Sequence, residues 1–377
     1  MMGAIWEGFR RAMQWLLRRP VTYLADRYSS APKREAVFGA LEELYQAAID
    51  PDSMKSDFLS LANERRPVII FSDQHKGGRN GADDFAIAEK NYLAALDYYN
   101  QLGFYCIALG DCEELWENSI FKVLKHNRGS FDAERRFIER DAFCKVYGNH
   151  DVFWRHDPLK ELYLKQMYGQ AIPIYGGIVI RVPVEGGEHI DVFCTHGHQG
   201  DAQSDGNWLS AAFVTYIWGP LQAFLRININ SPSSMIANKT LHNRMMYEWS
   251  ASKENVVLIT GHTHQPVFNS LTRLERLHIL IAEARQAGNE TLLHQYLNEL
   301  PERQRELPVV SEDFLTMKPS YFNTGCCCFS NGTISGIEAH EGMLRLVLWK
   351  YKDGVPTRVV AEETSLMDLG RKIMRQG

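Results

Sequence analysis

The stretch VVLITGHTHQPVF, at residues 256–268, joins a run of apolar residues to two histidines one residue apart. Residues 256–260 are typical of a strand buried on both faces, and Gly261 lets the chain turn sharply where that strand ends. Side chains at positions i and i+2 of an extended chain point to the same side, so His262 and His264 can face one site. An isolated HxH pair can equally be two unrelated loop histidines, and the rest of the chain decides between these interpretations.

The composition excludes some classes of protein. The chain has 377 residues, enough for two or three domains, and the proportions of an ordinary globular protein. Its net charge of -5 argues against general nucleic-acid binding, and no nucleic-acid partner is expected. Cys326, Cys327 and Cys328 are consecutive, so in a strand they would point to opposite faces rather than to one metal. The seven cysteines are expected to be reduced core residues of a cytoplasmic protein.

The first 20 residues are expected to form a basic amphipathic helix that ends at Pro20. One side of this helix would carry Ile5, Trp6, Phe9, Met13, Leu16 and Leu17. A helix of this kind can lie on an anionic membrane surface, so we expect peripheral contact with the inner membrane surface through residues 1–20. The alternative is a helix docked on its own domain or on a second subunit. No secretion signal is visible, and the sequence leaves the oligomeric state open.

Predicted strands and helices alternate along the chain, which indicates a layered α/β protein with mixed sheets. Short apolar runs predict strands at residues 67–71, 104–109, 143–147, 190–195 and 256–260. After the first of these, Phe85, Tyr92 and Leu96 lie at helical spacing, and Gly103 ends that helix. Residues 321 to about 360 are predicted to form several antiparallel strands.

Two stretches interrupt this alternation. Trp208 to Leu225 carries no charge over 18 residues, but Gly219 and Pro220 break it, so two short apolar helices are expected rather than a membrane span. Residues 272–307 are highly charged and are predicted to be helical. The predicted division of the chain is a helical N-terminal segment (1–64), a main domain (65–361) with insertions at about 203–250 and 272–315, and a helical, peripheral C-terminal tail (362–377).

Metal-binding residue types follow each of the five predicted strands. The segments are SDQHKGG with Asp73 and His75, GDCEELWE with Asp111, GNHD with Asn149 and His150, HGHQGD with His196, and GHTH with His262 and His264. In open α/β sheets, ligands bind beyond the carboxyl ends of the strands, so these five loops are expected to converge. Each segment alone is weak evidence, whereas all five together are highly specific.

The order and wording of these segments resemble the calcineurin-like metallophosphoesterase superfamily over roughly residues 67–340. The resemblance implies a two-sheet β-sandwich flanked by helices, with helical insertions, and a centre of two divalent transition-metal ions. Asp73, His75, Asp111 and His264 would hold the first ion, and Asp111, Asn149, His196 and His262 the second. Each of the two histidines of GHTH would then serve a different ion. Imidazole, carboxylate and amide ligands suit manganese, iron or zinc, and manganese is the first choice.

Such a centre suits phosphoryl chemistry. Two ions about 3.5 to 4 Å apart clamp the attacking and leaving oxygens and lower the pKa of a bridging water. The expected activity is hydrolysis of a phosphoester or pyrophosphate bond by a metal-bridging hydroxide. By the resemblance, His150 reaches the phosphate as general acid or charge stabiliser, and Glu114 orients it. Nearby residues have weaker assignments: Glu113, Asp151 and Asp201 as surface or supporting groups, and His198 as a candidate substrate contact.

The residues in these segments also indicate which branch of the superfamily the chain resembles. Protein phosphatases of this fold follow GDxxD with Arg-Gly, and this chain has Leu115 and Trp116 there. The wording is most similar to the bacterial UDP-2,3-diacylglucosamine diphosphatase branch, which carries an apolar cap for acyl chains. Trp208 to Leu225 would be a counterpart of that cap, or else an ordinary lid packed on the core. The expected substrate is lipid-linked or a small phosphorylated metabolite. Alternatives are a nucleotide phosphodiesterase or nuclease, and a non-catalytic metal-binding scaffold.

Overall fold

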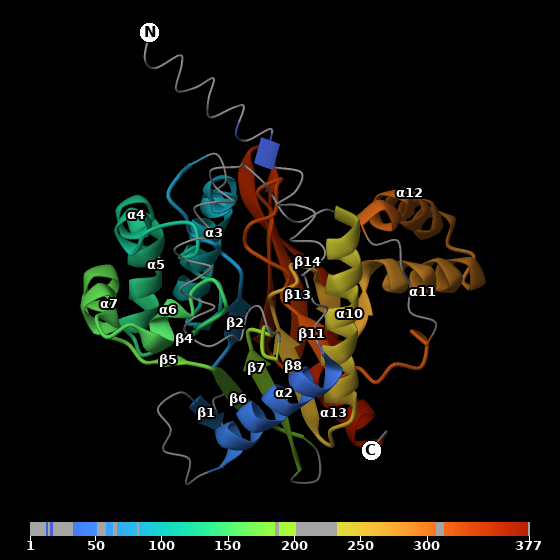
Figure 1. Cartoon of the computed structure of the whole chain (residues 1–377). Helices are drawn as coiled ribbons and strands as arrows, with labels where there is room; N and C mark the ends of the chain where they lie inside the picture. Colours follow the sequence, from blue (N-terminus) through green and yellow to red (C-terminus); the bar gives the residue numbers. More distant parts are fainter. Residues whose placement is uncertain are drawn as a thin grey trace.

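The chain folds into two facing β-sheets flanked by helices (Figure 1). The computed structural model describes residues 13, 16–17, 33–50, 58–62, 66–80, 83–184, 188–200, 232–306 and 313–375. Within these ranges each sheet has seven strands. The predicted fold class, a two-sheet α/β sandwich with flanking helices, is confirmed.

The first sheet has the order β14-β13-β12-β2-β3-β4-β5. Its parallel half consists of β2 (Val68–Phe71), β3 (Tyr105–Leu109), β4 (Phe143–Val146) and β5 (Ile174–Tyr175). Its antiparallel half consists of β12 (Ile334–His340), β13 (Met343–Lys352) and β14 (Val355–Ser365). The predicted antiparallel strands near the C-terminus are therefore confirmed for these three.

The second sheet has the order β1-β6-β7-β8-β11-β9-β10. Its strands are β1 (Phe58–Ala62), β6 (Gly177–Pro183), β7 (His189–Thr195), β8 (Val256–Thr260), β9 (Val267–Phe268), β10 (Leu271–Thr272) and β11 (Tyr321–Asn323). The central strands β7, β8 and β11 run parallel to one another. The apolar run at residues 256–260 is thus a fully buried strand in the middle of a sheet.

The main core lies between the two sheets. Val68 and Ile70 of β2 join a cluster with Val257 and Ile259 of β8 from the opposite sheet. Their neighbours in the chain, such as Phe71, point to the other side and pack on helices, as the period of two in a strand requires.

Helices cover both outer faces (Figure 1). The first sheet packs against α3 (Phe85–Gln101) and α5 (Arg128–Ile138), and the second against α2 (Arg34–Ile49) and α10 (Pro232–Ala251). Beside α5 lie the short helices α4 (Ile120–His126), α6 (Phe153–His156) and α7 (Lys160–Tyr168). The charged stretch predicted to be helical forms α11 (Arg273–Gln286) and α12 (Glu290–Glu306).

Three expectations about the termini and strand directions are wrong. The segment 1–64 is not wholly helical, because β1 forms the edge of the second sheet and pairs in parallel with β6. Strand β11 is parallel to β8 in the second sheet instead of joining the antiparallel strands. The tail is not peripheral: β14 runs to Ser365, and α13 (Leu366–Arg375) buries Leu369 and Ile373 in the main core. Burial of these two apolar side chains holds the helix on the sheets.

Other predictions fall outside the described residues. These include most of the amphipathic segment 1–20, the apolar stretch 208–225 and Asp201. The division into domains also stays a prediction. Within the ranges that the structure describes, no helix has the length and apolar character needed to cross a membrane.

Candidate metal centre

The five predicted loops meet at the carboxyl ends of β2, β3, β4, β7 and β8, and backbone hydrogen bonds tie them together. The N–H of His75 donates to the carbonyl oxygen of Asp111 at 2.9 Å, which joins the β2 and β3 loops. The N–H of Leu115 donates to the carbonyl oxygen of His150 at 3.3 Å, which joins the β3 and β4 loops. The N–H of Gly261 donates to the carbonyl oxygen of His196 at 2.9 Å, which joins the β7 and β8 loops. The predicted convergence is therefore present.

One group of side chains gathers the residues expected at the first ion. Asp73 Oδ1 lies 3.1 Å from His264 Nε2, and the Nε2 atoms of His75 and His264 are 3.2 Å apart. His75 Nε2 also lies 3.8 Å from Asp73 Oδ1 and 3.8 Å from Asp111 Oδ2. Two imidazole nitrogens and two carboxylate oxygens therefore face a common point.

A second group gathers around the other side of Asp111. Asp111 Oδ2 lies 3.2 Å from His196 Nε2, and ligand atoms of Asp111, His196 and His262 all lie within 4.8 Å of one another. Asn149 is also buried, and the N–H of the next residue, His150, donates to Asp111 Oδ1 at 2.8 Å. The structure thus places Asp111 between both groups, where a bridging carboxylate was predicted.

Hydrogen bonds on the far side of two rings fix which nitrogen faces the centre. His196 Nδ1 lies 2.9 Å from the carbonyl oxygen of Leu109, which can only accept, so Nδ1 carries the hydrogen. His75 Nδ1 lies 2.9 Å from a carboxylate oxygen of Glu114. In their neutral form, both rings would therefore direct the lone pair of Nε2 to the centre, the arrangement that metal-binding histidines adopt.

Several buried acceptors at this point lack a partner. Asp73 Oδ1, Asn149 Oδ1 and His196 Nε2 have no hydrogen bond within the described part of the chain. A buried polar atom without a partner is destabilising by about 1–3 kcal/mol, and such atoms are rare. Divalent cations would satisfy all three at once, so the donor set fits a metal centre.

The electrostatics of the centre also favour cations. Burial alone would raise the pKa of Asp73, but His264 and His196 outweigh burial and hold that pKa well below its usual range. Burial, reinforced by His242 and His196, lowers the pKa of His262 well below its usual value. His262 is therefore a neutral imidazole, the form that binds metals.

The backbone at five of the predicted ligands is left-handed. The φ angles of Asp73, His75, Asp111, His262 and His264 lie between 50° and 68°. This conformation is destabilising by roughly 1–2 kcal/mol for a residue with a Cβ, and such residues cluster at functional sites. The chain bends directly after Gly261, as expected, where the N–H of Thr263 donates to the carbonyl oxygen of Gly261 at 2.8 Å.

Gly261 also permits a close approach between two loops. A Cβ at Gly261 would collide with the side chains of Ser72 and Asp73. Likewise, a Cβ at Gly148 would collide with the carboxylate of Asp111. The glycines of the GHTH and GNHD segments therefore let the ligand loops lie against one another.

His150 lies at the edge of the centre with its ring held on two sides. Its Nδ1 is 2.7 Å from Glu114 Oε2, and its ring stacks on Trp116 with centroids 4.0 Å apart and planes 22° apart. Glu114 was predicted to orient His150, and the same oxygen also contacts His75. His75, Asp111 and His150 also lie close enough together to hold a metal ion. The role of His150 as a general acid, and not as a metal ligand, therefore stays a prediction.

Glu113 and Asp151 were predicted to be either surface groups or supporting groups, and the structure shows them as supporting groups. Both are fully buried. Asp151 accepts hydrogen bonds from the backbone N–H groups of Cys112 at 2.7 Å and Gly148 at 2.6 Å, which links the β3 and β4 loops. Glu113 Oε1 lies 2.9 Å from Lys145 Nζ. His198 is also buried, and its contact with substrate stays a prediction.

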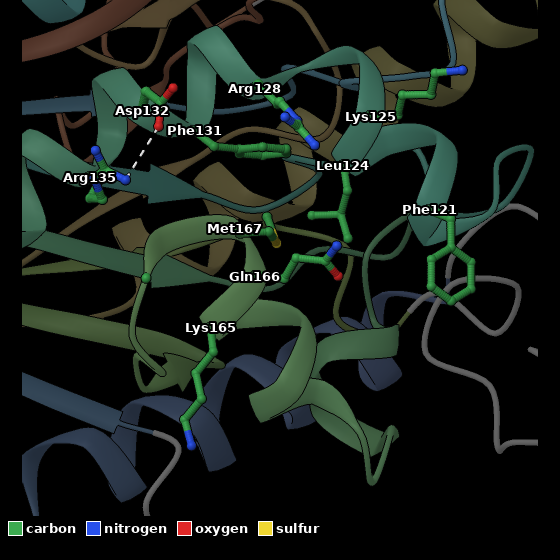
Figure 2. Close-up of a pocket in the computed structure, with 11 residues that line it drawn as sticks. Phe121, Leu124, Lys125, Arg128, Phe131, Asp132, Arg135, Lys165, Gln166 and Met167 are labelled. Atoms are coloured by element: carbon green, nitrogen blue, oxygen red, sulfur yellow. Dashed lines mark ion pairs between the residues drawn. The ribbon is translucent and has the colours of Figure 1, made fainter.

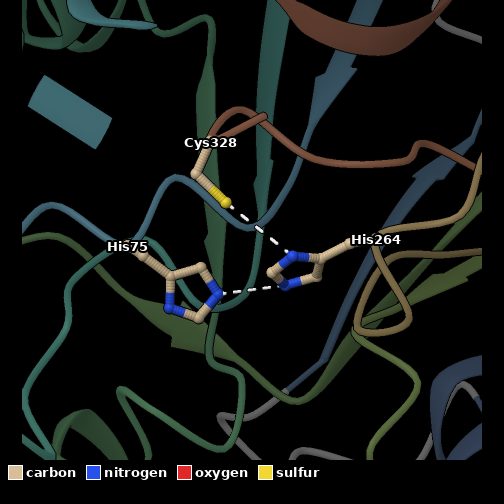
Figure 3. A group of neighbouring side chains, drawn as sticks. All are labelled: His75, His264 and Cys328. Carbon is tan, nitrogen blue, oxygen red and sulfur yellow. Dashed lines mark hydrogen bonds between the residues drawn. The ribbon is translucent and has the colours of Figure 1, made fainter. Parts of the chain in front are cut away.

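Cys328 corrects one expectation (Figure 3). All seven cysteines, which lie in the described ranges, are buried and free as predicted. However, Cys328 Sγ lies 3.8 Å from His264 Nδ1, and with His75 and His264 it forms a further candidate group for a metal. Cys326 to Cys328 lie in a loop after β11, so the alternation expected of a strand does not apply.

Sequence reasoning also missed one wall of the centre, helix α10. His242 Nε2 donates to the carbonyl oxygen of Gly197 at 2.5 Å, and its ring centroid lies 5.2 Å from that of His262. The sequence did contain a signal for this wall, because Lys239, His242 and Asn243 are spaced three and four residues apart and so form one polar face of a helix.

A cavity of about 440 Å³ lies elsewhere, between α4, α5 and α7 (Figure 2). Its lining includes Lys125, Arg128, Lys165 and the apolar Leu124 and Met167. None of the candidate metal ligands lines it, so this cavity is not the candidate centre.

Comparisons with known proteins add little. No family model and no curated protein matches the sequence. Among solved structures, the chain is similar to vacuolar protein sorting 29 from Cryptosporidium parvum, with 11% identity, a TM-score of 0.31, and coverage of 80% of this chain and 98% of that one. It is similar to a single mutant of Vps29 from Entamoeba histolytica, with 14% identity, a TM-score of 0.30, and coverage of 78% and 99%. It is also similar to a dimetal phosphatase from Danio rerio, with 8% identity, a TM-score of 0.34, and coverage of 79% and 99%. Similarities this weak assign neither a family nor an activity.

Proposed function

We propose that this chain is a metal-dependent phosphoesterase of the calcineurin-like superfamily, which hydrolyses a phosphoester or pyrophosphate bond. One observation carries the proposal: Asp73 Oδ1, Asn149 Oδ1 and His196 Nε2 are buried without a hydrogen bond, and His196 Nε2 lies 3.2 Å from Asp111 Oδ2. Carboxylate, amide and imidazole ligands together suit two divalent transition-metal ions, with manganese favoured over iron or zinc.

The residues of the chain have separate tasks in this reaction. The bound ions would supply a nucleophile at neutral pH and neutralise the charge of the phosphoryl group. His150 would hold a proton at Nε2 for the leaving oxygen, because its Nδ1 is already engaged by Glu114. Trp116 stacks on the ring and restricts its rotation.

The substrate class is proposed from the sequence. The apolar stretch 208–225 and the basic amphipathic segment 1–20 support a lipid-linked substrate or a small phosphorylated metabolite. They also support a cytoplasmic protein in peripheral contact with the inner membrane surface. These segments lie almost entirely outside the described residues, and the proposal depends on their composition alone.

Metal analysis joined to a hydrolysis assay tests the proposed function. We expect about two transition-metal ions per purified chain, and manganese-dependent hydrolysis of a chromogenic phosphomonoester or of a pyrophosphate. Hydrolysis of a chromogenic diester alone would indicate the nucleotide phosphodiesterase or nuclease instead. Metal binding without hydrolysis of any phosphoester would indicate the scaffold. A chain that takes up no metal after reconstitution would contradict the proposal.

A further inference from the structure

Helix α10 lies against the candidate centre with a fixed rotation about its own axis. His242 donates to the carbonyl oxygen of Gly197 at 2.5 Å on the β7 loop. Asn243 Oδ1 accepts from the hydroxyls of Thr263 at 3.0 Å and Tyr321 at 2.8 Å. Three contacts to different strand ends therefore determine which face of α10 the centre meets.

Lys239 lies on this same face, one turn before His242 and Asn243. Residues three and four apart in a helix are surface neighbours, so Lys239, His242 and Asn243 form one stripe. The stripe continues to Met246, which is fully buried in the core beneath the second sheet. Lys239 is thus carried toward the candidate centre and away from solvent.

The charge of Lys239 is within electrostatic reach of the first group of ligands. Burial lowers the pKa of its ammonium group, while Cys326, Asp73 and Cys328 oppose that shift. The ammonium group of Lys239 is therefore close enough to these three residues for their charges to affect it.

Lys239 is partly buried, yet no hydrogen bond or ion pair to its ammonium group occurs in the described ranges. The other lysines beside the centre differ: Lys76 lies 2.8 Å from Glu134, and Lys145 lies 2.9 Å from Glu113. A partly desolvated cation without a partner is destabilising until an anion reaches it. Lysine binds phosphate as a compact point charge.

We propose that Lys239 holds a phosphoryl oxygen of the substrate at the mouth of the candidate centre. The inference rests on the proposed phosphoesterase function and adds a substrate-binding residue to it. Because the cation comes from α10 and not from a ligand loop, substrate binding and metal binding would depend on different residues.

Inorganic phosphate tests this without relying on turnover. The full chain is loaded with manganese, and phosphate binding is measured by isothermal titration calorimetry for the wild type, Lys239→Met, Lys239→Arg and Arg244→Gln. Arg244 is the matched control, a cation on the same helix that is 57% exposed and pairs with Glu248. Metal content is measured on every sample.

We expect Lys239→Met to weaken phosphate binding roughly 10- to 100-fold, the value of a charged hydrogen bond. It should keep its manganese and its thermal midpoint, since the ammonium group of Lys239 has no hydrogen bond or ion pair in the described ranges and methionine retains the apolar stem. Lys239→Arg should recover most of the affinity, and Arg244→Gln should match the wild type. KM for a phosphomonoester should rise in Lys239→Met by a similar factor.

Each contrary result has a distinct meaning. Unchanged phosphate binding in Lys239→Met would overturn the inference and leave the proposed function intact. Loss of manganese in that variant would also overturn it, because Lys239 would then act on the centre itself. A wild type that binds no phosphate would exclude the site altogether. A wild type that binds phosphate through Lys239 but hydrolyses nothing would support the inference and contradict the proposed function.

Discussion

Two groups of polar side chains lie next to each other at β2, β3 and β4 and the loops that follow these strands. The groups differ in whether their buried polar atoms have partners. One is the candidate metal centre. The other, which we term the buried ion cluster, consists of Lys76, Glu113, Glu134 and Lys145, all fully buried. The two groups are joined by consecutive residues: the side chain of His75 points into the metal centre, and that of Lys76 points into the buried ion cluster.

Every charge in the buried ion cluster is satisfied. Glu113 contacts Lys145 at 2.9 Å and accepts from Trp154 Nε1 at 2.8 Å. Glu134 contacts Lys76 at 2.8 Å and accepts hydrogen bonds from the hydroxyls of two buried tyrosines. The centre, by contrast, leaves acceptors unpaired. The difference separates a group that supports the loops from a group that needs a ligand, and five experiments can break or sharpen it.

The largest effect is expected from Asp111→Asn, because Asp111 is the carboxylate shared by both groups of ligands. The amide binds a cation more weakly, so metal content should fall from about two ions per chain to below one, and hydrolysis should fall to background. Elemental analysis of the purified variant measures this. Asp132→Asn, an exposed carboxylate on α5, is the matched control. An Asp111→Asn chain that keeps two ions would contradict the bridging role.

Next in size is the effect of His150→Asn on turnover. The proposed proton donor is not required to hold the ions, so metal content should stay unchanged while kcat falls about 10²- to 10⁴-fold. Steady-state kinetics with manganese, run beside metal analysis, measures both. Full activity would contradict the catalytic role, and loss of metal would make His150 a ligand.

Lys145→Met should act on stability. Removing one partner leaves Glu113 short of a cation in the protein interior, which should lower the free energy of unfolding by about 3–5 kcal/mol. Urea unfolding of the metal-free protein measures this without any contribution from metal binding. Lys90→Met, an exposed lysine on α3, is the control. Equal unfolding of the two variants would mean that the buried ion cluster does not support the loops.

Glu114→Gln should have a smaller effect, because Glu114 orients other residues without contacting the ions. Its oxygen contacts both His75 and His150, so turnover and metal affinity should each fall roughly 10-fold. Kinetics and metal titration measure the two losses. Glu117→Gln, an exposed neighbour, is the control. A loss in turnover alone would restrict the role of Glu114 to His150.

Removal of residues 1–20 should leave both groups untouched. Turnover of a water-soluble phosphoester and the free energy of unfolding should match the full chain, while flotation with anionic liposomes should be lost. Equal flotation of the two forms, or none of either, would count against membrane contact through this segment.

The sequence predicts the centre better than its surroundings, for a physical reason. His262 and His264 follow a strand whose apolar residues identify it locally, and the carboxyl ends of such strands meet at one edge. The position of each loop therefore follows from local patterns.

The surroundings depend on contacts between distant parts of the chain. The proximity of Cys328 to His264 depends on the path of the loop after β11. The face that α10 turns inward depends on Thr263 and Tyr321, which are far from Asn243 in the chain. Nor does any local pattern distinguish a fully buried lysine such as Lys145 from an exposed one.

The left-handed backbone at the predicted ligands has a consequence for the evolution of related sequences. While the centre is in use, selection keeps Asp73, His75 and His264 in a conformation that is unfavourable for them. If a descendant lost the chemistry, glycine at these positions would relieve the strain and stabilise its fold. The first substitutions to spread in such a lineage would then be found at these positions. A relative with glycine there is expected to have drifted away from metal chemistry while keeping both sheets.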